Sequence, residues 1–372
     1  MKPTVAVLAG GVSAEHEVSL VSATEVVKAL RARGYEAHVV LIGRDGCWRR
    51  AGPRRLNAIT EPTVASLSRL CNASPAEHAF ESLLRLEKRG VQVVFPALHG
   101  RQGEDGMIQS CLEILGIAYV GSGVTASAVG MSKMLTRQAF LGASLPMPPA
   151  WCPEKREAVH GDPGDLCREM QKSLRFPVFL KADNSGSSLG VERVAKPGDF
   201  PAALARVRRM DRYWICEQAM EGVELTCAVL GNSGEQPIPL PPVQITPRHA
   251  SFFDYEAKYE SGASEELCPP TRVGRAEVEA AERLALGAHE LLGCRGFSRT
   301  DMIASRGGLY LFELNTIPGL TPASLVPLAA REAGLSFEDL VERLIQLAGR
   351  RSGARGACLR GEDRREAMAS RL

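Results

Sequence analysis

The first 125 or so residues alternate between short apolar runs and amphipathic segments. Runs that predict buried strands alternate with segments whose spacing predicts helices. The predicted strands cover 4–9, 37–42 and 91–95, and the predicted helices cover 19–31, 77–89 and 107–115. This order is typical of a doubly wound α/β domain with a parallel sheet. Residues 45–85 are otherwise poorly patterned, so the helix near 77–89 is the one element predicted there.

The pattern changes after a helix that begins near Gly121–Gly123 and carries Lys133 near its middle or end. Residues 145–149 (Leu-Pro-Met-Pro-Pro) cannot be helical and mark a boundary. Two strands, 178–182 and 191–194, then flank a loop too short for a parallel crossover, which predicts antiparallel pairing. The predicted elements that follow are strands at 213–218 and 224–230, an irregular segment at 237–270, a helix at 275–292 stopped by Gly293, a hairpin at 297–315 and a helix at 336–347.

The hairpin at 297–315 carries the most informative polar pattern. A turn at about 306–308 places Asp301 opposite Glu313, Arg299 opposite Asn315, and Ser305 opposite Leu309. Like charges that face each other across two strands are destabilising unless a cation lies between them. Carboxylate and amide oxygens are ligands that suit Mg²⁺, which completes its shell with water and substrate phosphates. The pattern therefore predicts that Asp301, Glu313 and Asn315 bind a metal.

The loop at 184–190 (Asn-Ser-Gly-Ser-Ser-Leu-Gly) follows Lys181 and contains G-x-S-x-G. A hydrolase nucleophile elbow requires a helix after this turn, but residues 191–194 are too short and too rich in valine to form one. The tip of such a hairpin instead offers backbone N–H groups and hydroxyls to phosphate oxygens, with Lys181 as a nearby charge. Because no G-x-x-x-x-G-K-[ST] occurs, this nucleotide site would differ from a P-loop.

Four further positions carry candidate polar groups. Glu217 and Glu224 bracket a turn between two strands, where carboxylates could accept hydrogen bonds from an adenosine. Glu15 follows Gly10-Gly11 in a tight turn that lacks the third glycine of the dinucleotide fingerprint. His99 lies just beyond a parallel strand, at the edge where such sheets bind ligands. Each of these residues could equally be structural.

A helix is also predicted after Gly319, with Thr321 as its N-cap and Pro322 at its first position. The free N–H groups at such an end can hold a carboxylate or a phosphate. An ordinary capped helix is the alternative interpretation.

Composition narrows the function classes. The 372 residues contain 45 Lys and Arg against 43 Asp and Glu, which argues against a dedicated nucleic-acid-binding protein. Seven arginines lie between Arg350 and Arg371, in a segment expected to be a solvated tail. No apolar run approaches the roughly 18 residues of a membrane span, and the ten cysteines form no C-x-x-C pair. We therefore expect a cytoplasmic protein that binds neither membrane nor nucleic acid.

Taken together, the motifs resemble those of the ATP-grasp ligases, and within them the D-alanine:D-alanine ligases. The resemblance covers about residues 4–348. Its motifs stand at 10–19, 99–106, 186–190, 256–259 and 313–319. It implies an N-terminal α/β domain (1–131) followed by an ATP-grasp fold of two subdomains (132–222 and 223–349), with a basic tail at 350–372.

The resemblance also implies roles for particular residues. In the family pattern, ATP is contacted by Lys133, Lys181, Ser187, Ser188, Glu217, Glu224 and Lys258. Two Mg²⁺ or Mn²⁺ ions would be held by Asp301, Glu313 and Asn315. The amino-acid substrates would be held by Glu15, His99, Arg299, Gly319, Ser324 and Leu325, with Ser187 and Tyr259 connecting closing lids to Glu15. A homodimer is implied by the same analogy.

Several alternatives stay open at this point. A non-catalytic nucleotide-binding protein on the same scaffold would need a damaged site, yet no expected phosphate, metal or oxyanion position is missing. A dehydrogenase is disfavoured by the incomplete glycine fingerprint. A ligase that uses D-serine or D-lactate as its second substrate is the more serious alternative. Tyr259, in Glu-Ala-Lys-Tyr, favours an amine over D-lactate.

Overall fold

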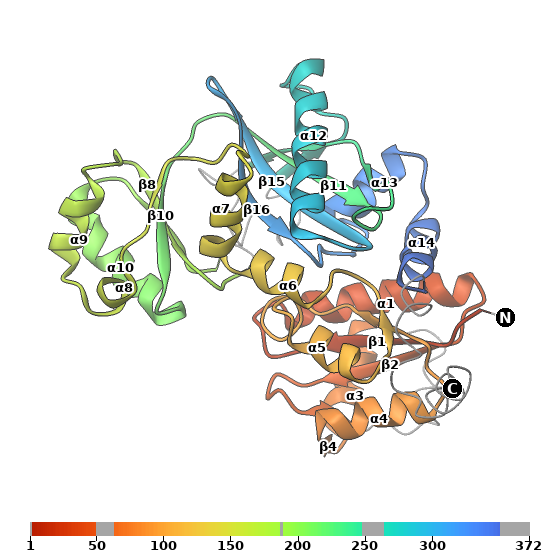
Figure 1. The fold of residues 1–372 in the computed structure, drawn as a ribbon. Helices are drawn as coiled ribbons and strands as arrows, with labels where there is room; N and C mark the ends of the chain where they lie inside the picture. The colour runs from red at the N-terminus through yellow and green to blue at the C-terminus, as the bar shows by residue number, and fades with distance from the viewer. Residues whose placement is uncertain (1, 50–62, 187–188, 248–263, 350–372) are drawn as a thin grey trace, which may run out of the picture.

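The computed structural model describes residues 2–49, 63–186, 189–247 and 264–349, which form three sheets with their helices (Figure 1). The first sheet has the order β4-β3-β2-β1-β5-β6. Its parallel strands are β1 (Val5–Gly10), β2 (Ala37–Ile42), β5 (Val93–Pro96) and β6 (Ala118–Tyr119), and its antiparallel edge strands are β3 (Trp48–Arg49) and β4 (Ala76–Glu77). The predicted parallel sheet is thus confirmed.

Helices cover both faces of this sheet, as the doubly wound pattern predicts. They are α1 (His16–Ala32), α3 (Val64–Ala73), α4 (Ala79–Lys88) and α5 (Met107–Ile114). α1 and α3 pack on one face through Leu20 and Leu67, and α4 and α5 pack on the other through Leu83 and Leu112. The prediction of a single helix in the poorly patterned region is wrong, because α3 also forms there. Its N-terminus is closed by a capping box between Thr63 and Ser66.

The helix predicted after Gly123 is divided into α6 (Val124–Met131) and α7 (Lys133–Gly142). Ser132 has an extended backbone, and its hydroxyl accepts a hydrogen bond from the backbone N–H of Leu135. Ser132 therefore caps a new helix. Lys133 begins α7, and the prediction that it lies near the middle or end of a helix is wrong.

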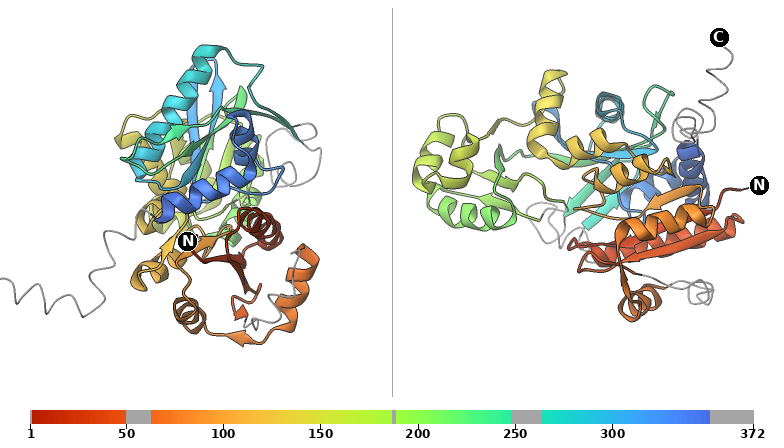
Figure 2. Two further views of the ribbon diagram at one scale, coloured as in Figure 1. Left: turned by 90° about the vertical axis from the view of Figure 1, so that its right-hand side faces the viewer. Right: turned by 60° about the horizontal axis from the view of Figure 1, so that its bottom comes forward.

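The second sheet is antiparallel and has the order β7-β10-β8-β9. Its strands are β7 (Ala150–Trp151), β8 (Val178–Ala182), β9 (Val191–Val194) and β10 (Trp214–Gln218), and they pack with helices α8 (Lys155–His160), α9 (Pro163–Met170) and α10 (Phe200–Met210), the last preceded by a 3₁₀ turn at Pro197–Asp199. A separate apolar core around Met170, Phe200 and Trp214 fills this unit. It forms the lobe at the left of Figure 1 and of the right-hand view in Figure 2.

The third sheet has the order β14-β13-β11-β15-β16, with β12 paired to β11. Its strands are β11 (Val223–Leu230), β12 (Ile238–Pro239), β13 (Val243–Pro247), β14 (Ser264–Leu267), β15 (Phe297–Ser305) and β16 (Gly308–Asn315). The described parts of the segment predicted to be irregular thus contain three short strands. Helix α12 (Arg275–Leu292) covers one face of the sheet and ends at Gly293, whose φ of +66° is the left-handed conformation that glycine tolerates (Figure 1).

Two C-terminal helices, α13 (Leu325–Glu332) and α14 (Phe337–Gly349), join the first and third sheets. α14 lies against α1, and one continuous apolar core contains Val26 of α1, Leu230 of β11 and Leu344 of α14 (Figure 1). Because burying apolar surface is the main favourable term in folding, this core holds the two units together. None of the described residues in this core belongs to the second sheet.

This shared core yields a stability prediction. Leu344 is fully buried, whereas Leu291 at the end of α12 is 42% exposed. Replacing Leu344 with alanine leaves a cavity, so the free energy of unfolding should fall by about 2–5 kcal/mol. Leu291→Ala, the matched control, should change it by no more than about 0.5 kcal/mol. Urea denaturation measures both, and equal losses would contradict the shared core.

Candidate active site

A cavity of about 520 Å³ opens between the first and third sheets. Its walls come from α1, the loop after β5, the start of α7, the end of β16 and the start of α13. Nine of the predicted site residues line it: Glu15, His99, Lys133, Arg299, Glu313, Asn315, Gly319, Ser324 and Leu325. Four others do not: Lys181, Glu217, Glu224 and Asp301. Ser187, Ser188, Lys258, Tyr259 and the tail at 350–372 lie outside the described residues.

The turn after β1 places Glu15 in the cavity wall. Gly10 and Gly11 have φ values of +95° and +99°, and a Cβ on Gly10 would stand 2.1 Å from the carbonyl oxygen of Ile42. The turn is fastened by Ser19, whose hydroxyl accepts a hydrogen bond from the Gly10 N–H (2.8 Å) and donates to the Ala97 carbonyl. Glu15 therefore occupies the N-cap position of α1 and is buried. The predicted tight turn that presents Glu15 is confirmed.

His99 lies three residues beyond β5 and is buried. Its Nε2 atom lies 3.4 Å from the Ser22 hydroxyl on α1. Burial lowers the pKa of this imidazole, and the negative charge of Glu15 opposes that shift only in part. The position of His99 at the ligand edge of the parallel sheet agrees with the prediction.

Glu104 is a cavity residue to which the sequence interpretation assigned no role. Its carboxylate is buried, and the Gly100 N–H donates to Oε2 at 2.7 Å. Burial first, and then the negative charge of Glu15, raise the pKa of Glu104 from its ordinary 4.5 to about 8. The sequence feature that could have identified Glu104 is its place in the glycine-rich stretch 99–106, beyond a parallel strand.

The predicted register of the hairpin is confirmed at the end that carries Asp301 and Glu313 and is wrong near the turn. Asp301 pairs with Glu313 and Arg299 with Asn315, as predicted. The register then shifts by one residue, so Ser305 faces Gly308 instead of Leu309. An extra residue in one strand at this point is a β-bulge, which re-aims side chains. Leu311 consequently packs in the apolar cluster beside α12 and not on the face of Glu313.

The hairpin carboxylates already have cationic neighbours. Arg299 binds Asp301 through two hydrogen bonds of 2.7 and 2.8 Å, and the Thr226 hydroxyl donates to the same carboxylate at 2.6 Å. Glu313 lies 3.9 Å from the Lys133 ammonium. The repulsion between the two facing carboxylates is thereby offset.

The chemistry of these donors fits a hard divalent cation. Asp301 and Glu313 supply carboxylate oxygens, and the Asn315 side chain supplies an amide oxygen that now accepts a hydrogen bond from the Ile317 N–H at 2.9 Å. Across the described ranges, no group of three or more His, Cys, Asp or Glu side chains could hold a metal. A cation here would therefore depend on Asn315 and on oxygens from water or substrate phosphates.

Two lysines stand at the junction with the second sheet. The Lys133 ammonium donates to the Ser185 carbonyl at 2.5 Å, and burial lowers its pKa. Lys181 of β8 forms an ion pair of 2.5 Å with Glu217 of β10, and its ammonium lies 5.0 Å from the centre of the Phe312 ring. The sequence pattern did not predict the contact between Lys181 and Phe312, because the bulge positions Phe312.

Asp183 holds the start of α7 near these lysines. Its carboxylate accepts hydrogen bonds from the Ser132 hydroxyl (3.0 Å) and from the Met134 N–H (2.9 Å).

Glu217 and Glu224 do bracket a short connection, but β10 and β11 belong to different sheets. The predicted turn is therefore the crossing from the second sheet to the third.

The residues at the start of α13 also line the cavity. Ser324 is the N-cap residue, so the prediction of Thr321 as the cap is wrong. Residues 321–324 instead form a turn in which the Ser324 N–H donates to the Thr321 carbonyl and the Ser324 hydroxyl accepts from the Thr321 N–H. A Cβ on Gly319 would stand 2.8 Å from the Ser324 hydroxyl, so the backbone approaches closely there.

Comparison with known proteins accounts for this arrangement. The family model for the D-ala D-ala ligase N-terminus matches residues 4–122, and the model for the D-ala D-ala ligase C-terminus matches residues 140–346. The chain belongs to the D-alanine–D-alanine ligase family. The D-alanine–D-alanine ligase of Desulforudis audaxviator is 41% identical over 348 residues, which are 93% of this chain and 99% of that protein.

Solved structures of the family share the fold. The D-alanine-D-alanine ligase from Coxiella burnetii has a TM-score of 0.76 at 26% identity and covers 98% of this chain and 99% of its own. A D-Ala:D-Ser ligase from Enterococcus faecalis has a TM-score of 0.75 at 28% identity and covers 94% of this chain and 100% of its own. The predicted ATP-grasp architecture of this ligase family is thus confirmed. In the described part of the ligase no helix is long and apolar enough to cross a membrane.

The raised pKa of Glu104 predicts a pH-dependent stability. Folding takes up a proton at this carboxylate, so its contribution is complete below about pH 4.5 and is lost as the pH rises to about 8. Glu104→Gln cannot ionise. Between pH 5 and 8 its free energy of unfolding should therefore fall less steeply than that of the unmodified ligase, by on the order of a few kcal/mol over the range. Denaturation curves at several pH values measure this, with exposed Glu332→Gln as the control. Identical slopes in all three proteins would contradict the assignment.

Proposed function

We propose that this ligase joins two D-alanine molecules into D-alanyl-D-alanine, with conversion of ATP to ADP and phosphate. The carboxylate of the first D-alanine attacks the γ-phosphorus, which releases ADP and forms an acyl phosphate. The amine of the second D-alanine then attacks the acyl carbon, and phosphate and a proton leave. The observation that carries this proposal is a cavity lined by the buried carboxylate of Glu15, by Arg299 and by residues at the N-terminus of α13.

Glu15 is the group that would hold the ammonium of the first D-alanine. It is a buried acceptor in a region of low dielectric, where an ion pair with a bound ammonium is strong. His99 stands beside it, with a lowered pKa that keeps the ring neutral near pH 7. A neutral imidazole can orient the substrate without repelling the ammonium.

Arg299 and the N–H of Gly319 would stabilise the oxyanion that forms when the amine attacks. Preorganised donors of this kind are usually the largest electrostatic contribution to acyl transfer. Ser324 and Leu325, at the start of α13, would take the carboxylate of the second D-alanine through their backbone N–H groups.

The ATP site lies between the second and third sheets in this proposal. Lys133 and Lys181 would contact the phosphates, and Glu217 and Glu224 the adenosine end. Ser187, Ser188 and Lys258 complete the proposed ATP contacts, and Ser187 with Tyr259 would exclude water from the acyl phosphate. Asp301, Glu313 and Asn315 would hold two Mg²⁺ or Mn²⁺ ions, which when bound supply charge neutralisation at the phosphates.

Several broader statements belong to the same proposal. Division of the ligase into units at 1–131, 132–222 and 223–349 agrees with the three sheets. The cytoplasmic location, the homodimer and the supply of dipeptide to peptidoglycan synthesis follow from family analogy. D-serine is the second substrate to test beside D-alanine, because the fold is shared with a D-Ala:D-Ser ligase.

Phosphate release tests the reaction directly. Purified ligase with ATP and Mg²⁺ should release phosphate with D-alanine and not with L-alanine or without an amino acid, and mass spectrometry should find the dipeptide. Parallel reactions that add D-serine or D-lactate to limiting D-alanine identify the second substrate. A mixed D-alanyl-D-lactate product in preference to the dipeptide at neutral pH would refute the amine preference. ATP binding without phosphate release would favour a non-catalytic binding protein.

The metal assignment predicts the behaviour of a single variant. Glu313→Ala removes one carboxylate donor from a partly buried position in the cavity wall and should lower turnover at least about 100-fold in Mg²⁺. Its circular dichroism spectrum and its unfolding midpoint should stay close to those of the unmodified ligase. Glu332→Ala, on the surface of α13, is the control and should keep full turnover. Retained activity of Glu313→Ala would contradict the metal role.

A further inference from the structure

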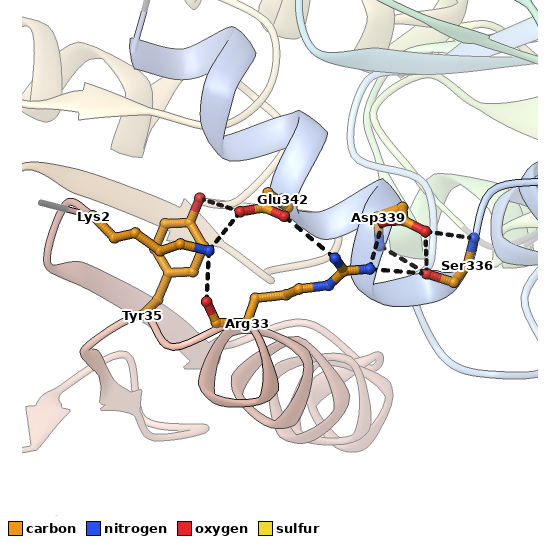
Figure 3. Close-up of polar contacts among 6 residues, drawn as sticks. All are labelled: Lys2, Arg33, Tyr35, Ser336, Asp339 and Glu342. Atoms are coloured by element: carbon orange, nitrogen blue, oxygen red, sulfur yellow. Dashed lines mark hydrogen bonds and ion pairs between the residues drawn. The ribbon is translucent and has the colours of Figure 1, made fainter.

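Six side chains, none of which lines the cavity, join the segment at the end of α1 to the start of α14 (Figure 3). These residues, called the α1–α14 clasp below, are Lys2, Arg33, Tyr35, Ser336, Asp339 and Glu342. They come from sequence positions about 300 residues apart. The network therefore connects the N-terminal unit directly to the C-terminal one.

Glu342 is the centre of the clasp. Its Oε1 atom accepts hydrogen bonds from the Lys2 ammonium (2.7 Å) and the Tyr35 hydroxyl (3.0 Å), and Oε2 lies 3.7 Å from the Arg33 guanidinium. Lys2 also donates to the Arg33 carbonyl at 2.6 Å, and its ammonium lies 4.4 Å from the centre of the Tyr35 ring. The hydrogen bond from Lys2 is the main cause of a lowered pKa at Glu342. Burial first, and then Glu342, raise the pKa of Tyr35 to about 12, so the phenol stays protonated and donates.

Arg33 makes the second connection. Its guanidinium contacts the carboxylate of Asp339 and lies 3.5 Å from the Ser336 hydroxyl. Ser336 and Asp339 bind each other at the start of α14, because the Asp339 N–H donates to the Ser336 hydroxyl and the Ser336 N–H donates to the Asp339 carboxylate. Arg33 thus binds the part of α14 whose position is already fixed by its own cap.

The two helices that the clasp joins both lead to the cavity. α1 supplies Glu15, Glu17, Val18 and Val21 to one wall. α14 packs against α13, and Leu325 of α13 and its N-cap residue Ser324 also line the cavity. A displacement of α1 along its axis relative to α14 would therefore change the separation between these two groups of cavity residues.

Apolar contacts such as those of Val27, Leu30 and Val341 in the core shared by α1 and α14 are not directional. Hydrogen bonds and ion pairs have defined geometry and fix the register of a contact. We propose that the α1–α14 clasp fixes the axial register of α1 and so sets the width of the amino-acid cavity. Arg33 and Glu342 are positioning residues in this view, and the inference rests on the proposed function.

Steady-state kinetics of Arg33→Ala and Glu342→Gln test the proposal. The KM for D-alanine should rise about fivefold in each, with the KM for ATP within about twofold of normal, because α1 and α14 carry none of the proposed ATP contacts. Arg33→Lys keeps the positive charge and should recover part of the loss. Lys28→Ala is the matched control: Lys28 also lies on α1 but pairs with Glu25 of the same helix. Asp339 is left unchanged because its loss would also remove the cap of α14.

The outcomes distinguish a failure of the clasp inference from a failure of the proposed function. A rise in the D-alanine KM alone, with partial rescue by lysine, supports the clasp. Equal changes in both KM values, or a lower unfolding midpoint with both KM values unchanged, would mean that the clasp is only structural and would overturn the inference. If the unmodified ligase itself forms no dipeptide from D-alanine, the proposed function fails and not the clasp alone.

Discussion

Burial of α14 against α1 and the first sheet is the interaction on which the rest of the structure depends. Leu344, Val341 and Ile345 of α14 enter the same apolar core as Val5 and Val7 of β1. This core makes one body of the N-terminal and C-terminal units, although more than 300 residues separate β1 from α14 in the chain. The cavity lies at the junction of the two units, so its location follows from that packing. The second sheet has its own core, and among the described residues of its loop Ser185 and Gly186 line the cavity.

Charge within the cavity follows from the same packing. Glu15 and Glu104 are removed from water, and burial together with the charge of Glu15 disfavours ionisation of Glu104. Glu104 is consequently neutral near pH 7, and Arg299, Lys133 and the start of α13 also line the cavity. An amino acid carries one charge of each sign. A cavity lined by groups of both signs is suited to such a molecule.

The loop at 184–190 shows how the three units meet. Ser185 accepts a hydrogen bond from Lys133 of α7, and a Cβ on Gly186 would stand 3.2 Å from the Glu15 carboxylate. The second sheet thus brings a glycine backbone close to the first unit and a carbonyl close to the start of α7. In the proposed reaction this closeness serves to exclude water from the activated carboxyl group.

Local pattern was sufficient wherever the deciding interactions are near in sequence. The helix 275–292 with its glycine stop, the strand pair at 178–194 and the opposition of Asp301 to Glu313 were all predicted, because helix periodicity, short connections and cross-strand pairing are local. Tertiary packing alone decided the bulge that aims Phe312 at Lys181, the burial of Glu104 and the clasp between α1 and α14. Each of these depends on what distant segments bring into contact, and no periodicity in one segment records the low dielectric or the partner that another segment will supply.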